Sequence, residues 1–79
     1  MSDCIIIRNF RKNIITVYNV HPNMTIIELK QKLYKEYNVV EPKKQCLIYI
    51  KDVTEDDKIL SDYGQYWMRP YGFYLICSM

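Results

Sequence analysis

The clearest pattern in the chain is a stripe of apolar residues between Met24 and Asn38. Apolar side chains recur there at the spacing of one helical face, which predicts an amphipathic helix; they are Ile26, Leu29, Leu33 and Tyr37. Thr25 and Glu28 have the spacing of a capping box, which marks the start of a helix, and Asn38 favours the left-handed conformation that ends one. The pattern therefore predicts one capped helix whose apolar face packs against a sheet.

Short runs of β-branched and aromatic residues predict strands on both sides of this helix. The predicted strands are residues 4–7 and 14–20, which form a hairpin, and residues 45–50 and 72–77, with a very short edge strand around Val53 and one helical turn over residues 59–64. The second strand is ambiguous, because Ile15 and Val17 compete with Tyr18 and Val20 for the interior unless a bulge accommodates both pairs.

The order of these elements predicts the fold class. A hairpin, a helix, a strand, short elements and a final strand indicate an α+β fold in a single domain over residues 1–79. A β-grasp accepts this order, with a mixed four- to five-stranded sheet curled around one α-helix and with the first and last strands as parallel neighbours at its centre.

Strand alternation assigns the apolar residues to two faces of the sheet. Those predicted to face the helix are Ile5, Ile7, Leu47, Tyr49, Phe73 and Leu75, and those predicted for the opposite face are Cys4, Ile6, Ile48, Ile50, Tyr74 and Ile76. A solvated face normally carries polar residues, and a contiguous apolar patch is typical of a partner interface. The alternative is edge packing in a small sheet. We expect partner binding at Ile6, Phe10, Ile48, Ile50, Trp67, Tyr74 and Ile76.

Composition excludes several functions and suggests a compartment. The 79 residues are 49% hydrophobic and 25% charged with a net charge of +2, which indicates a globular domain without the basic stripe of a nucleic-acid-binding protein. No apolar run approaches the roughly 20 residues of a membrane span. Three cysteines without metal-ligand spacing indicate free thiols. We expect a soluble intracellular protein, cytoplasmic or nuclear, with neither a nucleic-acid nor a membrane partner.

The sequence has no pattern that indicates catalysis or a cofactor. His21 lies beside Pro22 in a predicted turn, without the nucleophile and acid that a general base needs. Asp56 and Asp57 are adjacent, so their side chains diverge, and a solvated turn fits them better than a metal site. We therefore expect no enzyme activity, no cofactor and no metal.

Three segments together resemble ubiquitin-like domains. They are Thr25-Ile26-Ile27-Glu28-Leu29-Lys30 at the helix start, Gln45-Cys46-Leu47-Ile48-Tyr49 in the third strand and Leu60-Ser61-Asp62-Tyr63 in the helical turn. The resemblance covers almost the whole chain and implies that Ile48, Tyr74 and Ile76 belong to a hydrophobic patch that other proteins bind. The sequence departs from ubiquitin at Ile76-Cys77-Ser78-Met79, where there is no diglycine. We therefore expect a protein that is not conjugated.

Within this superfamily the chain is similar to the elongin B family at several points where it departs from ubiquitin. These are Ile7-Arg8, Arg11, Ile14 and Thr16 in the hairpin, Glu28-Leu29-Lys30 in the helix, Asp56-Asp57-Lys58 and Gly64 around the acidic turn, and Arg69-Pro70. The acidic turn is shorter than in that family and the last loop is more aromatic, and we expect no C-terminal extension beyond the fold. The resemblance implies an adaptor subunit that pairs with an elongin C-like partner in a cullin-type ubiquitin ligase.

Two alternative functions stay open at this point. Ras-binding domains share the fold and use basic residues near the hairpin and helix, which here are Arg8, Arg11, Lys12, Lys30 and Lys32. Self-association through the sheet, as a homodimer, is the other. A basic-patch interaction weakens steeply with ionic strength and an apolar interface hardly responds, so salt dependence separates the first alternative from partner binding through the apolar face.

Overall fold

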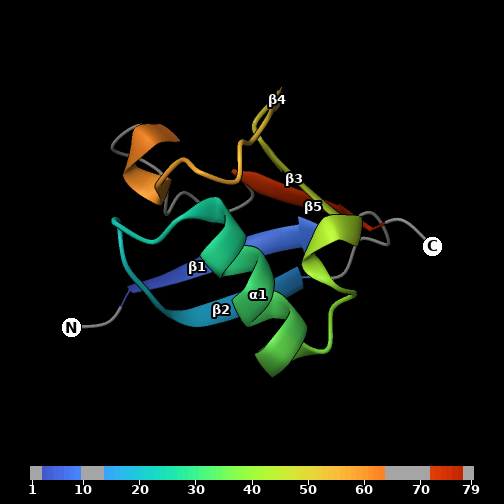
Figure 1. The fold of residues 1–79 in the computed structure, drawn as a ribbon. Coiled ribbons are helices and arrows are strands. Elements are labelled where there is room, and N and C mark those ends of the chain that lie inside the picture. Colours follow the sequence, from blue (N-terminus) through green and yellow to red (C-terminus); the bar gives the residue numbers. More distant parts are fainter. Residues whose placement is uncertain (1–2, 10–13, 64–71, 78–79) are drawn as a thin grey trace.

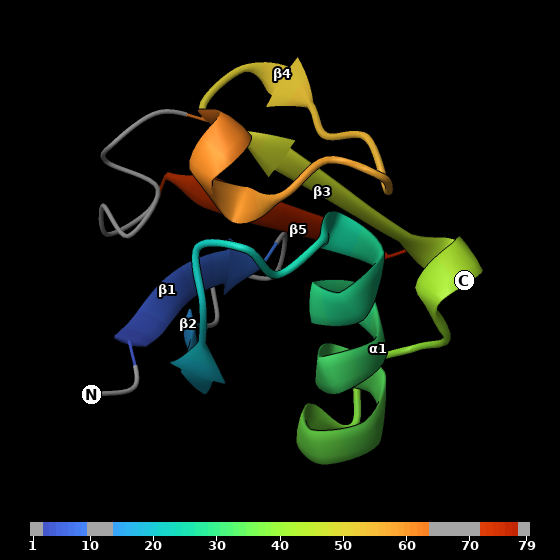
Figure 2. The ribbon, with the colours of Figure 1, turned by 60° about the vertical axis from the view of Figure 1, so that its left-hand side comes forward.

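The computed structural model describes residues 3–9, 14–63 and 72–77. The elements follow the order β1 (Asp3–Asn9), β2 (Ile14–Val20), α1 (Ile26–Tyr37), η1 (Pro42–Lys44), β3 (Gln45–Tyr49), β4 (Asp52–Val53), η2 (Leu60–Tyr63) and β5 (Phe73–Cys77). Figure 1 shows α1 lying across the sheet, and Figure 2 gives a view turned by 60°. Phe10, Arg11, Lys12 and Trp67, which the sequence singled out, lie outside the described residues.

The strands form one five-stranded sheet in the order β2-β1-β5-β3-β4. β1 is antiparallel to β2 and parallel to β5, whereas β3 is antiparallel to both β5 and β4. The first and last strands are therefore parallel neighbours at the centre of a mixed sheet. This arrangement confirms the predicted α+β β-grasp fold.

The predicted capping of α1 is confirmed at both ends. The Thr25 hydroxyl oxygen accepts the Glu28 N–H at 3.2 Å, and the Glu28 carboxylate accepts the Thr25 N–H at 3.1 Å. Asn38 ends the helix with φ 58°, in the left-handed region. These caps satisfy backbone groups that the helix leaves without intrahelical partners, and they fix where α1 begins and ends.

The core lies between α1 and the face of the sheet that it covers. It consists of Ile5, Ile7, Val17, Val20, Ile26, Leu29, Leu33, Leu47, Tyr49, Leu60, Phe73 and Leu75. Every residue that alternation assigned to the helix side of β1, β3 and β5 belongs to this set, which confirms that part of the prediction. Full burial of one such aliphatic side chain contributes about 1.5–3 kcal/mol to stability.

A bulge resolves the ambiguity in β2. Asp3 pairs with Val20, but Cys4 pairs with Tyr18, so Asn19 is an extra residue in β2. Asn19 has φ 61°, a left-handed conformation that Asn tolerates better than most residues. The bulge shifts the alternation by one residue, and Val17 and Val20 are therefore both buried.

Lys30, which the sequence offered as a basic residue for Ras-type binding, is buried in the structure. It is only 7% exposed, and its Nζ lies 2.7 Å from the Asp56 Oδ1. The side-chain amide of Gln45 donates to the Lys30 carbonyl at 2.8 Å, which holds this turn of α1 against β3. The ion pair with Asp56 neutralises the charge of this buried lysine. This contact joins residues 26 positions apart, and helical spacing gave no sign of it.

Candidate protein-interaction surface

The face of the sheet opposite α1, here called the outer face, carries one row of side chains across all its strands. Strand pairing sets Ile14 beside Arg8 and Arg8 beside Tyr74. It then sets Tyr74 beside Ile48 and Ile48 beside Val53. Because directly paired residues project to the same side, these five side chains form a continuous line from one edge of the sheet to the other.

Further pairs extend the outer face on both sides of this row. They are Cys4 with Tyr18, Ile6 with Thr16 and Cys46 with Ile76. Together with the row, they define the outer face as Cys4, Ile6, Arg8, Ile14, Thr16, Tyr18, Cys46, Ile48, Val53, Tyr74 and Ile76. Arg8 carries the single charge in this set.

Several apolar side chains of the outer face are open to solvent. The exposed fractions are 67% for Val53, 58% for Tyr18, 53% for Ile14 and 40% for Ile76. Ile6, Ile48 and Tyr74 are half-buried beside them. A single exposed Leu or Ile is ordinary on a protein surface, whereas a connected set of this kind is a candidate interaction surface.

Four of the residues predicted to bind a partner share the outer face, whereas Ile50 lies just beyond the end of β3. Ile6, Ile48, Tyr74 and Ile76 lie there, whereas β3 ends at Tyr49. Ile50 begins the turn between β3 and β4 with φ 60°, so strand alternation does not apply to it. It is nevertheless 61% exposed.

Sequence reasoning missed three exposed members of the outer face, Ile14, Tyr18 and Val53. The Asn19 bulge determines which residues of β2 face outward. β4 has only two residues, which is too short for an alternation pattern. The spacing of Ile14, Thr16 and Tyr18 contained the signal, but it can be used only after the bulge has been placed.

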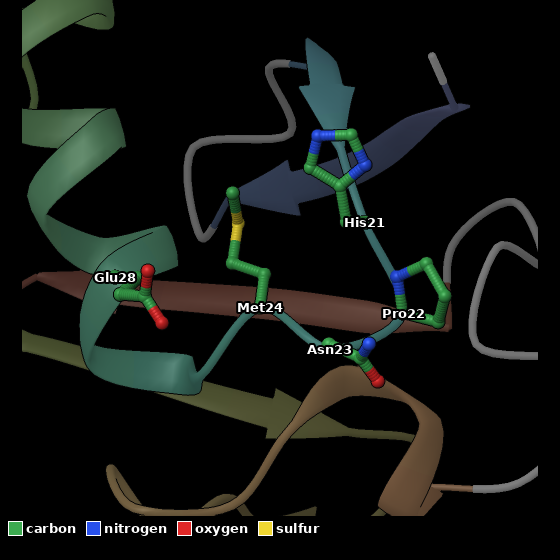
Figure 3. A pocket seen from close by; sticks show the side chains of 5 residues that line it. All are labelled: His21, Pro22, Asn23, Met24 and Glu28. Carbon is green, nitrogen blue, oxygen red and sulfur yellow. The ribbon is translucent and has the colours of Figure 1, made fainter. Parts of the chain in front are cut away.

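A second feature is the open hollow between β2 and α1 that Figure 3 shows, lined by His21, Pro22, Asn23, Met24 and Glu28. The Glu28 carboxylate is committed to the capping box, because its Oε1 accepts from both the Thr25 N–H and the Thr25 hydroxyl. The backbone hydrogen bond, followed by the hydroxyl bond, lowers the pKa of Glu28 from its ordinary value of 4.5. These contacts make Glu28 a structural group, and the hollow supplies no chemistry of its own.

Other kinds of site find little support in the described part of the chain. Its His, Cys, Asp and Glu residues include no group of three placed to hold a metal ion. None of its helices has the length and apolar character to cross a membrane. The basic set expected for Ras-type binding loses two members to internal ion pairs, since Lys30 meets Asp56 and the Lys32 Nζ lies 2.9 Å from Glu36.

The mixed sheet, the single capped helix and the outer face together define a ubiquitin-like domain. The model of the ubiquitin family matches residues 5–65, and the chain belongs to that family. No curated protein matches the sequence. Domains of this family typically act as protein-interaction modules and not as enzymes.

Proposed function

We propose that the protein is an elongin B-like adaptor, which binds an elongin C-like subunit of a cullin-type ubiquitin ligase through its outer face. The observation that supports this proposal best is the row from Ile14 through Arg8, Tyr74 and Ile48 to Val53, in which one cation stands among apolar neighbours. The partner is assigned from the resemblance to the elongin B family.

Packing of the core does not explain why the exposed side chains of this row are apolar. α1 buries the inner face of the sheet, and the side chains of the outer face stay at the surface. Burial of exposed apolar area against a partner contributes about 25 cal/mol per Å². The gain is greatest for side chains that are open in the free domain, such as Val53 and Ile14.

The chemistry of the outer face suits a protein partner. Tyrosine and arginine are enriched at the residues that contribute most to binding, and here Tyr74 and Arg8 are neighbours at the centre of the row. Because Arg8 pairs with Ile14 on one side and Tyr74 on the other, the complementary surface is largely apolar.

The backbone conformation of Ile50 is a second, independent reason to expect partner binding at this end of the sheet. Its left-handed backbone occupies the first position of a two-residue turn, where hairpins favour glycine. A β-branched residue is disfavoured there, and an exposed isoleucine gains little from the core. Contact of its side chain with a partner explains why isoleucine occupies this position.

The test is the affinity for purified elongin C, measured by isothermal titration calorimetry. We expect one elongin C to bind each native chain, and Ile48→Arg and Ile76→Arg each to weaken binding by at least about thirtyfold, the loss typical of a residue central to an interface. Gln31→Arg adds the same charge at an exposed position of α1, away from the outer face, and should bind as the native chain does.

Three results would overturn the proposal. A native chain that shows no binding to elongin C removes the adaptor role. Equal losses for Gln31→Arg and Ile48→Arg show that added charge, and not the outer face, controls the affinity. Binding that weakens steeply with salt and is insensitive to Ile76→Arg contradicts an apolar interface.

A further inference from the structure

The free edge of β2 lacks the usual protection of an edge strand. β2 is the outermost strand on its side of the described sheet, and its sequence, Ile-Ile-Thr-Val-Tyr-Asn-Val, contains no charged residue and no proline. Edge strands normally carry lysines, prolines or bulges that prevent another chain from pairing with them. Here a bulge at Asn19 interrupts only the end of the strand.

One side chain from the helix occupies this edge. The hydroxyl oxygen of Tyr37, the last residue of α1, accepts the backbone N–H of Tyr18 at 3.0 Å. The ring of Tyr37 packs against the core, so its hydroxyl is held in place. Tyr37 thus takes up a backbone donor that would otherwise be open to an incoming strand.

The pairing of β2 with β1 shows which other groups face the same way. Tyr18, Thr16 and Ile14 pair with Cys4, Ile6 and Arg8. In an antiparallel ladder alternate residues direct their N–H and C=O groups away from the partner strand. The Tyr18 N–H does so, because it reaches Tyr37. Thr16 and Ile14 lie two and four residues before Tyr18 in the strand, so they also direct their backbone N–H and C=O groups to the free edge.

We propose that this edge is a strand-addition site for a second copy of the chain, and that the Tyr37 hydroxyl closes it in the monomer. A two-fold axis through Thr16 pairs the two β2 strands antiparallel. It sets Ile14 opposite Tyr18 of the second copy, and Thr16 opposite its own equivalent. Each Tyr18 N–H then exchanges the Tyr37 hydroxyl for the Ile14 carbonyl of the other copy. This site is the strand edge, and it is independent of the proposed adaptor role.

A second copy is the occupant because β2 is complementary to itself. The pairing places an aromatic residue opposite a β-branched one twice and a threonine opposite a threonine once, which are favourable cross-strand pairs. A symmetric contact brings identical surfaces together, so a charged strand would repel its copy. The strand over residues 14–20 carries no charge and avoids this repulsion.

The test compares Tyr37→Phe with Tyr34→Phe by sedimentation equilibrium. Tyr37→Phe keeps the ring and removes the hydroxyl that competes in both copies, so two competing hydrogen bonds disappear per dimer. We expect its dimer to be tighter than that of the native chain by about tenfold to a hundredfold. Tyr34 is an exposed tyrosine one turn earlier, and Tyr34→Phe should match the native chain. Tyr37→Leu, which removes the same hydroxyl with a different side chain, should associate as Tyr37→Phe does.

A further variant tests the register. Thr16→Lys in the Tyr37→Phe background places two cations opposite each other across the two-fold axis and should restore the monomer at low salt. Hydrogen exchange should show the Tyr18 amide losing protection in monomeric Tyr37→Phe and the Thr16 amide gaining it on association. The proposal is overturned if both Tyr37 variants stay as monomeric as the native chain, if Tyr34→Phe associates equally, or if Thr16→Lys leaves the dimer intact.

Discussion

Two adjacent residues of β5 show how differently the two faces of the sheet are used. Leu75 is 1% exposed on the face that α1 covers, whereas Ile76 is 40% exposed on the outer face. The two side chains have similar size and hydrophobicity. Burial against the helix explains why residue 75 is apolar. It does not explain why the exposed residue 76 is also apolar.

The same contrast in β3 shows what hydrophobicity alone can identify. Leu47 belongs to the core, while Ile48 lies half-buried on the outer face beside exposed Val53. An apolar residue in a strand is therefore a candidate for either role, and the position of the covering helix distinguishes the two. Substitutions on the two faces should accordingly affect different measurements.

The largest effect is expected on the inner face. Leu33→Ala removes a fully buried side chain of α1 and should lower the free energy of unfolding by about 2–5 kcal/mol, because it loses buried apolar area and leaves a cavity. Urea denaturation followed by circular dichroism measures this. Ile76→Ala is the matched control and should cost well under half as much. Equal costs would show that the two faces are equally important for folding.

How much of this contrast the sequence predicts depends on whether a feature is local. The caps at Thr25 and Asn38 and the alternation in β3 arise from neighbouring residues, and the sequence predicted them correctly. The burial of Lys30 depends on Asp56, which a distant loop supplies. The left-handed backbone of Asn19 determines which residues of β2 face the core, and sequence periodicity does not reveal this conformation.

The candidate surface follows the same rule. Sequence alternation placed Ile48 and Ile76 on the outer face because each lies in a regular strand, and their ladder partners Tyr74 and Cys46 lie on the same face. Val53 was missed as a surface residue because its two-residue strand has no period, and only its pairing with Ile48 reveals its place. Sequence alone therefore identifies the centre of the outer face better than its edges.

Ile50 is expected to give the next largest effect, with the opposite sign. Ile50→Gly removes a β-branched side chain from a left-handed position and should raise the free energy of unfolding by about 1 kcal/mol, since glycine has no steric penalty there. The same urea titration measures the gain, and calorimetry with elongin C should show weaker binding. A loss of stability would mean that this isoleucine supports the fold.

The capping box of α1 should give a smaller effect that depends on pH. Hydrogen bonds from Thr25 lower the pKa of Glu28 in the folded state, so the carboxylate stabilises the fold above its ordinary pKa. This contribution disappears as the pH falls through the lowered pKa. We expect the stability of the native chain to fall more than that of Glu28→Gln between about pH 6 and about pH 3. Thr25→Ser, which keeps the hydroxyl, should retain the native pH dependence, and identical slopes for the native chain and Glu28→Gln would contradict this assignment.

The smallest effect on stability should come from the outer face itself. Ile76→Arg replaces an exposed side chain that pairs with Cys46 on β3, and the arginine stem can cover the same apolar atoms while its charge stays in water. We expect the free energy of unfolding to change by no more than about 0.5 kcal/mol, as is usual for surface substitutions. The same variant should lose partner binding, so the two measurements together separate binding from folding. A large loss of stability would place Ile76 with Leu75 in the core, and the contrast between the two faces of β5 would then fail.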